Sequence, residues 1–486
     1  MNIKKLLLLI FTVNMIMSCS EWLDVAPDDQ VNEKTLFKTG EGYRNALNGV
    51  YRDMADFSMY GRELSWGMLD VLSQMYNSSN ISSHHVYGQV LNYQYEASNF
   101  DNLVTEIWGS AYNAIANCNN LISRIRLEND DKFAEGEIEK KLILGEALGL
   151  RAYIHFDMLR LFGPSPREVD EKTYIPYFET YGSTFEPRLS FNEIISRVER
   201  DLKEARILVG ACDTLAKNHH WFRTMYRMLG GEGKQDSQLP DELFFAYRGY
   251  RMNYYAVTAT LARVYSWTGK HEEAFECANE VIYAHNMVSG SKELCFYFTD
   301  TELFDQNRKT YDEIIFCLSN QKLIERYEDF TTKATSNDTR LTFRLSSLFS
   351  GDQDDDRRKD LFTKIDYNDM STKYMKQAAN TYGEDMIPMI RVSEMYYIIS
   401  EYYYNMNYPD DGIYYLDYVR TARGCAAGKL NNTITNLNEL EAAIVQDAKR
   451  DFIGEGQTFY HYKKFNIKPS SNAKFVLPLP EREIIN

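Results

Sequence analysis

The sequence predicts a mainly α-helical protein, and three patterns support this fold class. Apolar residues recur at three- and four-residue steps over segments long enough for helices of several turns. Small residues lie at the spacings of a tetratricopeptide repeat, in which two antiparallel helices touch. Strand-like runs are short and few. We therefore expect tetratricopeptide-like helix pairs that form a right-handed solenoid scaffold, with long irregular loops and minor β elements.

The N-terminus has the pattern of an export signal that ends at a cysteine. Lys4 and Lys5 precede a mostly apolar run, and Ser18 and Cys19 follow it. This order is typical of a secretory signal peptide, and the run is too short for a transmembrane helix. The residues Ile-Met-Ser-Cys at 16–19 resemble a bacterial lipobox, in which the cysteine is acylated and becomes the first mature residue. We expect 1–18 to be the signal peptide and Cys19 the lipid attachment site; the alternative is an ordinary secreted protein with an incidental cysteine.

The segment 65–102 follows no helical period. It reads SWGMLDVLSQMYNSSNISSHHVYGQVLNYQYEASNFDN and is rich in Asn, Ser, Gln and Tyr. Long irregular segments in a compact protein are usually binding loops or disordered, and this one contains too many aromatic residues for disorder. The sequence therefore predicts a region of ligand-binding loops.

Two long helices are expected in the middle of the chain. The first, EKKLILGEALGLRAYIHFDMLRLF, places its apolar residues on one stripe and stops at Gly163-Pro164, because proline cannot continue a helix. The second begins at Ser190, which can form a capping box with Glu193. Further along, 228–242 has the composition of a surface loop, and YDEIIFCLSN at 311–320 has that of a β-strand.

Two later segments carry the tetratricopeptide-like pattern. In 255–285 the characteristic positions are occupied by Leu261, Ala262, Tyr265, Gly269 and Ala274. The segment 393–424 repeats the pattern more loosely, and Gly412 replaces the usual alanine. The sequence predicts three or four helix pairs, enough to stack into a short solenoid.

Composition excludes some partners. The formal charge of the 486-residue chain is −16, and loss of 1–18, which contains two lysines and no acid, changes it to −18. Such acidity argues against binding to nucleic acid or adsorption to anionic lipid. The six cysteines after Cys19 form neither a C-x-x-C pair nor a dense framework, which favours buried thiols, although Cys277 and Cys295 could pair. Residues 19–486 can bury a large core, in one elaborate domain or two ordinary ones.

Short motifs resemble the SusD/RagB family of outer-membrane nutrient-binding lipoproteins along nearly the whole chain. CSEWLDVAPDDQV resembles the start of the mature family members, and WGSAYNAIANCNNLISRI their W-x-x-x-Y helix. Later helices of the family are matched by EALGLRAYIHFDMLRLFGPSP, IPMIRVSEMYYIISE and YVRTARG, and the closing signatures by KRDFIGEGQTFYHYKKF and FVLPLPEREIIN. Each motif alone is weak, and their order is specific. Gln457, Thr458 and His461 depart from the residues common after G-E-G.

The resemblance implies a fold, a location and a partner. It implies one SusD-like body over 19–486, with an N-terminal part of about 19–210 that holds the ligand-binding loops and a C-terminal part of about 250–486. It also implies a lipid-anchored protein of the outer membrane that faces the exterior. The implied partner is a SusC-like TonB-dependent transporter, which the lipoprotein covers as a lid.

No residue pattern predicts an enzyme. With 70 acidic residues, no carboxylate pair stands out as catalytic. The sequence DQDDDRRKD begins like a calcium loop, but Arg357 replaces the required glycine and Thr363 the bidentate glutamate. Glu455 lies near His461 and Lys463 in the sequence, which favours a structural ion pair. We expect no catalytic residue, no metal and no cofactor.

The ligand-binding residues are expected among the aromatic and amide side chains of 65–102. A tyrosine offers an apolar face and a hydrogen-bonding tip, which suits a sugar ring, and side-chain amides donate and accept at once. The resemblance points to the same stretch, because the ligand arc of the family draws on it. The candidates are Trp66, Tyr76, Asn77, Asn80, Tyr87, Tyr93 and Tyr95.

The favoured function is capture of a nutrient oligosaccharide at the cell surface and its delivery to the transporter. An oligopeptide is the alternative ligand, because the family includes peptide importers. Two other classes compete: a lipid-anchored glycoside hydrolase, which would release reducing ends from glycans, and a periplasmic helical-repeat scaffold, which protease added to intact cells would not reach.

Overall fold

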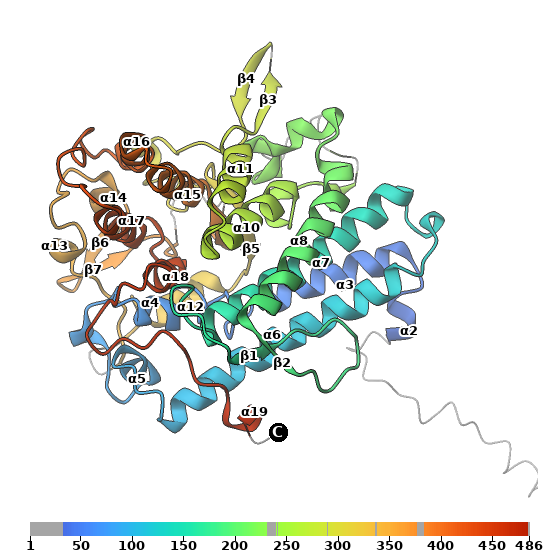
Figure 1. Cartoon of the computed structure of the whole chain (residues 1–486), viewed down its shortest axis with the longest axis horizontal. Coiled ribbons are helices and arrows are strands. Elements are labelled where there is room, and N and C mark those ends of the chain that lie inside the picture. The colour runs from blue at the N-terminus through green and yellow to red at the C-terminus, as the bar shows by residue number, and fades with distance from the viewer. Residues whose placement is uncertain are drawn as a thin grey trace, which may run out of the picture.

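The computed structural model describes residues 33–230, 240, 242–288, 290–335, 338–376 and 383–484 (Figure 1). Helices dominate this part of the chain and strands are few, which confirms the predicted mainly-α fold. The predicted signal peptide 1–18 and Cys19 lie outside the described residues. Within the described part, none of the helices combines the length and the apolar character that crossing a bilayer requires.

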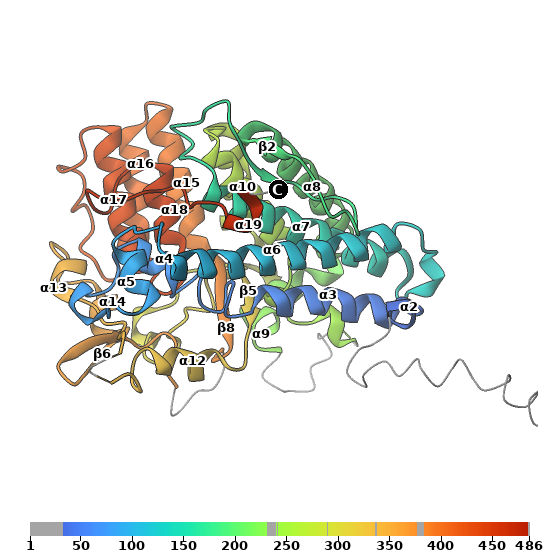
Figure 2. The ribbon, with the colours of Figure 1, turned by 90° about the horizontal axis from the view of Figure 1, so that it is seen from below.

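Four long helices form the N-terminal part, and α3 and α6 lie side by side (Figure 2). In turn α7 packs against α6 and α8. The predicted capping box is present, since the Ser190 side chain accepts from the backbone of Glu193 and the Glu193 side chain accepts from that of Ser190. These helices are α3 (Gly40–Met54), α6 (Ser98–Ile125), α7 (Gly136–Phe162) and α8 (Phe191–Asp213).

Two helix pairs carry the tetratricopeptide-like pattern, and they stack because α11 packs against α15. In the second pair, a Cβ at Gly412 would lie only 2.9 Å from the carbonyl oxygen of Ser400. The Ser400 hydroxyl donates to the Gly412 carbonyl at 2.6 Å. Glycine thus permits the close contact for which the repeat uses a small residue. The pairs are α10 (Tyr254–Trp267) with α11 (His271–Ile282) and α15 (Val392–Asn405) with α16 (Pro409–Thr421).

The β structure consists of antiparallel pairs of strands. The predicted strand within 311–320 is present as β5, which is buried and pairs with β8. Of the predicted surface loop 228–242, residues 231–239 and 241 lie outside the described residues. The pairs are β1 (Thr173–Pro176) with β2 (Arg188–Ser190), β3 (His285–Val288) with β4 (Ser291–Leu294), β5 (Ile314–Ser319) with β8 (Met386–Arg391), and β6 (Phe362–Ile365) with β7 (Asn368–Ser371).

The segment 65–102 differs from its prediction, because much of it is helical. It contains α4 (Met68–Leu72), η2 (Ser78–Asn80), α5 (Val86–Leu91) and the start of α6. Helices this short complete too few turns to show a period in the sequence. The remaining elements are α2 (Glu33–Leu36), η3 (Asp130–Lys132), η4 (Ala216–Phe222), α9 (Thr224–Arg227), η6 (Leu243–Phe245), η7 (Arg248–Tyr250), η8 (Thr301–Leu303), α12 (Leu323–Asp329), α13 (Leu345–Leu348), α14 (Asp356–Asp360), α17 (Leu437–Asp451), α18 (Gln457–Lys464) and α19 (Glu481–Ile484).

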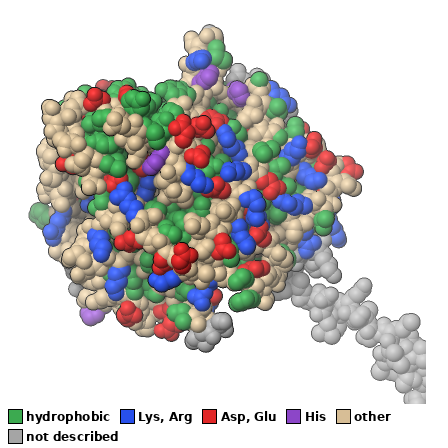
Figure 3. Space-filling view, in the orientation of Figure 1, with side chains coloured by type: hydrophobic (Ala, Val, Ile, Leu, Met, Phe, Trp, Pro, Cys, Tyr) green, Lys and Arg blue, Asp and Glu red, His purple; other side chains and the backbone are tan. Residues whose placement is uncertain are grey.

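One apolar core extends through the described part of the chain, from Phe37 before α3 to Leu477 near the C-terminus. Figure 3 shows acidic and basic side chains interspersed over the surface on the right, and an apolar patch at the upper left, over α15 and α16. Exposed tyrosines on α16 include Tyr414 and Tyr418. The described cysteines are all buried and free, so Cys277 and Cys295 do not form a disulfide.

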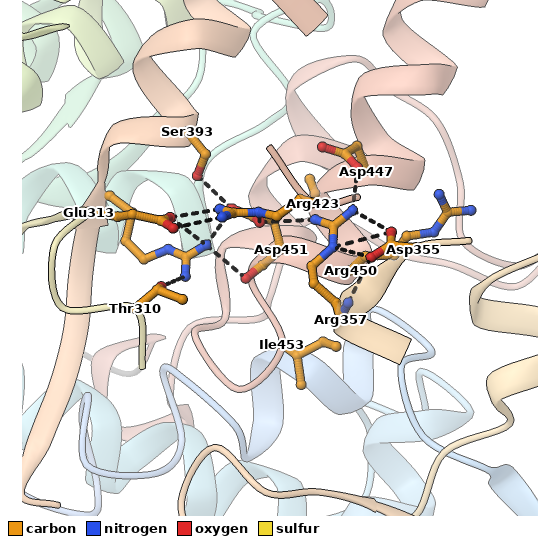
Figure 4. A network of polar contacts seen from close by, with 12 residues as sticks. Thr310, Glu313, Asp355, Arg357, Ser393, Arg423, Asp447, Arg450, Asp451 and Ile453 are labelled. Atoms are coloured by element: carbon orange, nitrogen blue, oxygen red, sulfur yellow. Dashed lines mark hydrogen bonds and ion pairs between the residues drawn. The ribbon is translucent and has the colours of Figure 1, made fainter. Parts of the chain in front are cut away.

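A buried ionic network joins the C-terminal segments around Asp451 (Figure 4). The Asp451 carboxylate pairs with Arg357 at 2.9 Å and Arg423 at 2.8 Å, and it also pairs with Arg391. The Ser393 hydroxyl donates to it at 2.6 Å. Burial by itself would raise the pKa of Asp451, but the three arginines hold it well below its usual value.

The same network corrects the ion pair expected for Glu455. Its carboxylate pairs with Lys373, and with Arg391 at 3.5 Å, and not with Lys463. Lys463 instead donates to the backbone carbonyls of Arg160 and Phe475 at 2.5 and 2.7 Å. The interaction is structural, as expected, but its partners lie far away in the sequence.

Candidate functional site

The five aromatic candidates of 65–102 lie in the core. Trp66, Tyr87 and Tyr93 are at most 2% exposed, and Tyr76 and Tyr95 are each 6% exposed. This corrects the expectation of an aromatic loop open to a ligand. The short helices α4 and α5 turn the segment inward, where rings from distant parts of the chain cover it. The Trp66 ring, for example, lies edge-on to Tyr327 and Phe330, with centroid distances of 5.3 and 5.6 Å.

These rings also use their polar atoms inside the protein. The Trp66 indole N–H donates to the carbonyl of Gly61 at 3.0 Å, and the Tyr87 hydroxyl to the carboxylate of Glu63 at 2.9 Å. The hydroxyls of Tyr76, Tyr93 and Tyr95 donate to the carbonyls of Trp66, Leu72 and Lys474 at 2.6, 2.5 and 2.7 Å. Their contacts are those of packing residues, and a role in ligand binding stays a prediction.

Asn77 and Asn80 are partly exposed, and both meet segments from the C-terminal part. The Asn80 amide donates to Thr342 Oγ1 at 2.8 Å and to Asn368 Oδ1 at 2.7 Å. The Asn77 side-chain oxygen accepts from Arg344 Nε at 2.8 Å. The backbone N–H of Arg340 also donates to the carbonyl of Asn80 at 2.8 Å. We use the name polar edge for these contacting residues together with Tyr367, which precedes Asn368: Asn77, Asn80, Arg340, Arg344, Tyr367 and Asn368.

Tyr367 lies at the tip of the β6–β7 hairpin on this edge. Ile365 pairs with Asn368, so Asp366 and Tyr367 form a two-residue turn. Their φ angles are 47° and 65°, as in a type I′ turn, where a glycine is preferred at the second position. A side chain in this left-handed conformation costs about 1–2 kcal/mol. The Tyr367 ring is 96% exposed, so packing does not offset the cost. Strain of this kind marks a residue as a binding candidate.

A cavity of about 590 Å³ lies apart from the polar edge. It is bounded by α3, by the η6–η7 segment and by the end of β5. Such a volume accommodates a small ligand. Its lining includes Arg44, Asn48, Phe244, Tyr247, Tyr250 and Arg251.

One cluster offers the donor atoms of a metal site, namely Asp352, Asp354 and Cys425. The Asp352 carboxylate, however, already binds Arg420 at 2.6 Å and Lys429 at 2.9 Å, and it also binds Arg450. Three cations around one carboxylate disfavour a further cation there. The residues of this cluster therefore do not fit a metal ion.

Sequence reasoning missed both Tyr367 and the cavity. The residues around Tyr367 do offer a signal, because FTKI and NDMS flank a two-residue gap. That gap reads Asp-Tyr and not Asn-Gly, which hides the hairpin. The cavity has no local signal, since its walls come from segments far apart in the sequence.

Two family models match the chain in succession. A model described as "Starch-binding associating with outer membrane" matches residues 21–219, and one described as "SusD family" matches 247–475. Two curated relatives from Formosa agariphila are similar to parts of the chain. "SusD-like protein P2" is 28% identical over 180 residues, which is 34% of this chain and 33% of that protein, and "SusD-like protein P38" is 24% identical over 204 residues, which is 42% and 37%. The chain thus matches little more than a third of the length of these relatives.

Solved structures share the fold. A SusD superfamily protein from Bacteroides thetaiotaomicron superposes with a TM-score of 0.68 at 19% identity, over 92% of this chain and 98% of that one. A protein from Bacteroides vulgatus described as a "SusD-like carbohydrate binding protein" superposes with a TM-score of 0.61 at 17% identity, over 88% and 84%.

Proposed function

The chain belongs to the SusD/RagB family, and on this premise we propose that it is a surface lipoprotein that binds a nutrient oligosaccharide and delivers it to a SusC-like TonB-dependent transporter. A SusD-like nutrient-binding role and association with the outer membrane come with the family. The proposal adds the ligand, the partner and the lipid at Cys19. The words "starch-binding" and "carbohydrate binding" in the descriptions of the matches support a sugar as ligand.

The exposed ring of Tyr367, in the hairpin that Asn80 contacts through Asn368, carries the ligand proposal. A sugar ring can stack its C–H face on the tyrosine, while the two amides and Arg344 exchange hydrogen bonds with its hydroxyls. Asn77 and Asn80 were predicted from the sequence, and Asn80 donates to Asn368, the residue that follows Tyr367 in the hairpin. An oligopeptide is the alternative ligand, because its backbone also offers donors and acceptors to amides.

Replacing Tyr367 by glycine should stabilise the protein and weaken its ligand binding. Glycine relieves the left-handed strain, so the free energy of unfolding should rise by about 1 kcal/mol. Loss of a stacking contact should weaken binding about 2- to 10-fold. Urea unfolding and calorimetry with malto-oligosaccharides, followed by other glycans and peptides, measure the two effects.

The matched variants are Tyr367→Phe, which keeps the ring and should keep the affinity, and Tyr414→Ala, which removes an exposed tyrosine on α16, outside the polar edge. A Tyr367→Gly protein that binds as tightly as the wild type would remove this residue from the site. Absence of binding to every oligosaccharide tested, together with binding of peptides, would favour the peptide alternative.

Replacing Cys19 by alanine should release the protein from the membrane. An acyl chain contributes about 0.8 kcal/mol per buried methylene, and several chains on one cysteine anchor a protein durably. The variant should appear in the aqueous phase after detergent partitioning, in cells that lack the transporter. Ser20→Ala is the control.

In cells that contain the transporter, tagged wild-type protein should co-purify with a large β-barrel.

Retention of the Cys19→Ala protein in the membranes of transporter-deficient cells would contradict the anchor. Recovery of periplasmic proteins alone with the tagged wild type would favour the scaffold class over a transporter lid.

A further inference from the structure

Two arginines that line the 590 Å³ cavity each have one nitrogen that no described residue pairs with. Arg44, 9% exposed, donates from Nε to Glu139 at 2.6 Å and from Nη1 to Glu242. Arg251 donates from Nε to Glu146 at 2.9 Å and from Nη1 to Asn48 at 2.6 Å. Among the described residues, neither Nη2 has a hydrogen-bond partner, although both atoms are buried.

A buried donor without an acceptor is unfavourable, and more so when it belongs to a charged group. The buried glutamates near these arginines do not accept a hydrogen bond from either Nη2 atom. Glu139 is bound by Arg44, and Glu146 is shared by Arg248 and Arg251. The two Nη2 atoms are therefore buried donors of residues that line the cavity, and within the described part of the chain no acceptor pairs with them.

The same wall is aromatic. The ring of Phe244 lies over both guanidinium groups, 4.9 Å from the Cζ atom of each arginine. Tyr247 and Tyr250 also line the cavity, and their rings pack edge-on at 6.2 Å. Tyr247 has a φ of 52°, a left-handed conformation that is unfavourable for a tyrosine, and it is 37% exposed. The wall thus combines charged donors with rings that can stack.

From this combination we infer that the cavity is a second binding site, which takes a small ring-bearing or peptide-like ligand through its carboxylate. A carboxylate only accepts hydrogen bonds, and its bonds to guanidinium groups are about twice as strong as neutral ones. Because both Nη2 atoms are shielded, the ligand must displace the Phe244 side chain to reach them. The carboxylate can come from a uronic acid of a glycan or from the C-terminus of a peptide.

The inference stands apart from the proposed function, since it uses none of the residues of the polar edge. It predicts that the protein distinguishes acidic ligands from their neutral analogues.

The test uses paired probes on the purified mature protein. Trigalacturonate and its methyl ester differ at their carboxyl groups, which are charged in the acid and neutral in the ester, and trialanine and its C-terminal amide differ at the C-terminus in the same sense. Calorimetry should show that at least one acid binds and that its neutral partner binds at least tenfold more weakly. The pair that shows the difference identifies the source of the carboxylate.

Two variants locate the binding. Arg251→Lys keeps a positive charge beside Glu146 but removes Nη2, and Tyr247→Gly removes a ring while it relieves backbone strain. Each should weaken binding of the acid at least fivefold with an unchanged circular dichroism spectrum, whereas Tyr367→Gly should not. Equal binding of acid and neutral probes, or acid binding that both cavity variants leave intact, would overturn the inference. If only Tyr367→Gly loses binding of a neutral glycan, the result supports the polar edge as a binding surface and does not bear on the cavity.

Discussion

Replacing Asp451 by alanine should lower the free energy of unfolding by about 3–5 kcal/mol, the cost of removing one partner from a buried ion pair. Asp451 is 3% exposed and its carboxylate contacts Arg357, Arg391 and Arg423. Its loss leaves three buried guanidinium groups with one acceptor fewer. Because these arginines come from α14, β8 and the turn after α16, the variant loosens several segments at once.

Urea unfolding at neutral pH measures the effect. Glu276→Ala is the control, because Glu276 is an exposed acid in a helix and its loss should change stability by less than about 0.5 kcal/mol. Asp451→Asn keeps the shape but not the charge, and it should also be clearly destabilised. A loss below 1 kcal/mol in both Asp451 variants would show that the network does not hold the C-terminal part together.

The pH dependence has a definite sign. The pKa of Asp451 is lower in the folded protein than in the unfolded chain, where an aspartate has a pKa of about 3.9. Its contribution to stability is therefore fully present above this pH and is lost as the pH falls through the lower, folded value. The difference in stability between wild type and Asp451→Ala should shrink as the solution is acidified below about pH 4.

The sequence predicted those features that depend on local patterns. The periodic helices α7, α8, α10 and α15, the capping box at Ser190 and the close contact at Gly412 are all visible in a few turns of chain. The short helices α4 and α5 gave no such pattern, and 65–102 was therefore predicted to be irregular.

Contacts between distant segments could not be predicted. Composition showed that 65–102 is aromatic, but whether a ring is exposed depends on what covers it. Tyr327 and Phe330, which cover Trp66, lie more than two hundred residues further along the chain. The same limit applies to Glu455, whose partners are Lys373, in the turn after β7, and Arg391, in β8. Asn77 and Asn80 are partly exposed because their amides reach the C-terminal segments at the surface of the core.

Replacing Trp66 by alanine separates packing from binding in 65–102. The side chain is fully buried, and removing a buried tryptophan costs about 3–5 kcal/mol through lost contacts and the cavity that remains. Its indole N–H bond to Gly61 and its edge-on contacts with Tyr327 and Phe330 disappear together. Trp66→Phe keeps part of the ring contacts, so it should lose clearly less stability.

If Trp66 only packs, the folded fraction of each variant should bind the oligosaccharide as tightly as the wild type does. Calorimetry at a temperature where Trp66→Phe is fully folded measures this directly, and Tyr367→Gly serves as the comparison in which affinity falls while stability rises. A Trp66→Phe protein that is stable but binds at least tenfold more weakly would instead place the indole in contact with the ligand. Such a result would require the segment 65–102 to open, because α12 and Phe330 now cover the Trp66 ring. The same sample should then show faster hydrogen exchange in α4 and α12 when ligand is bound. Unchanged affinity with lowered stability assigns the aromatic residues of 65–102 to the core and leaves the exposed polar edge as the proposed ligand-binding surface.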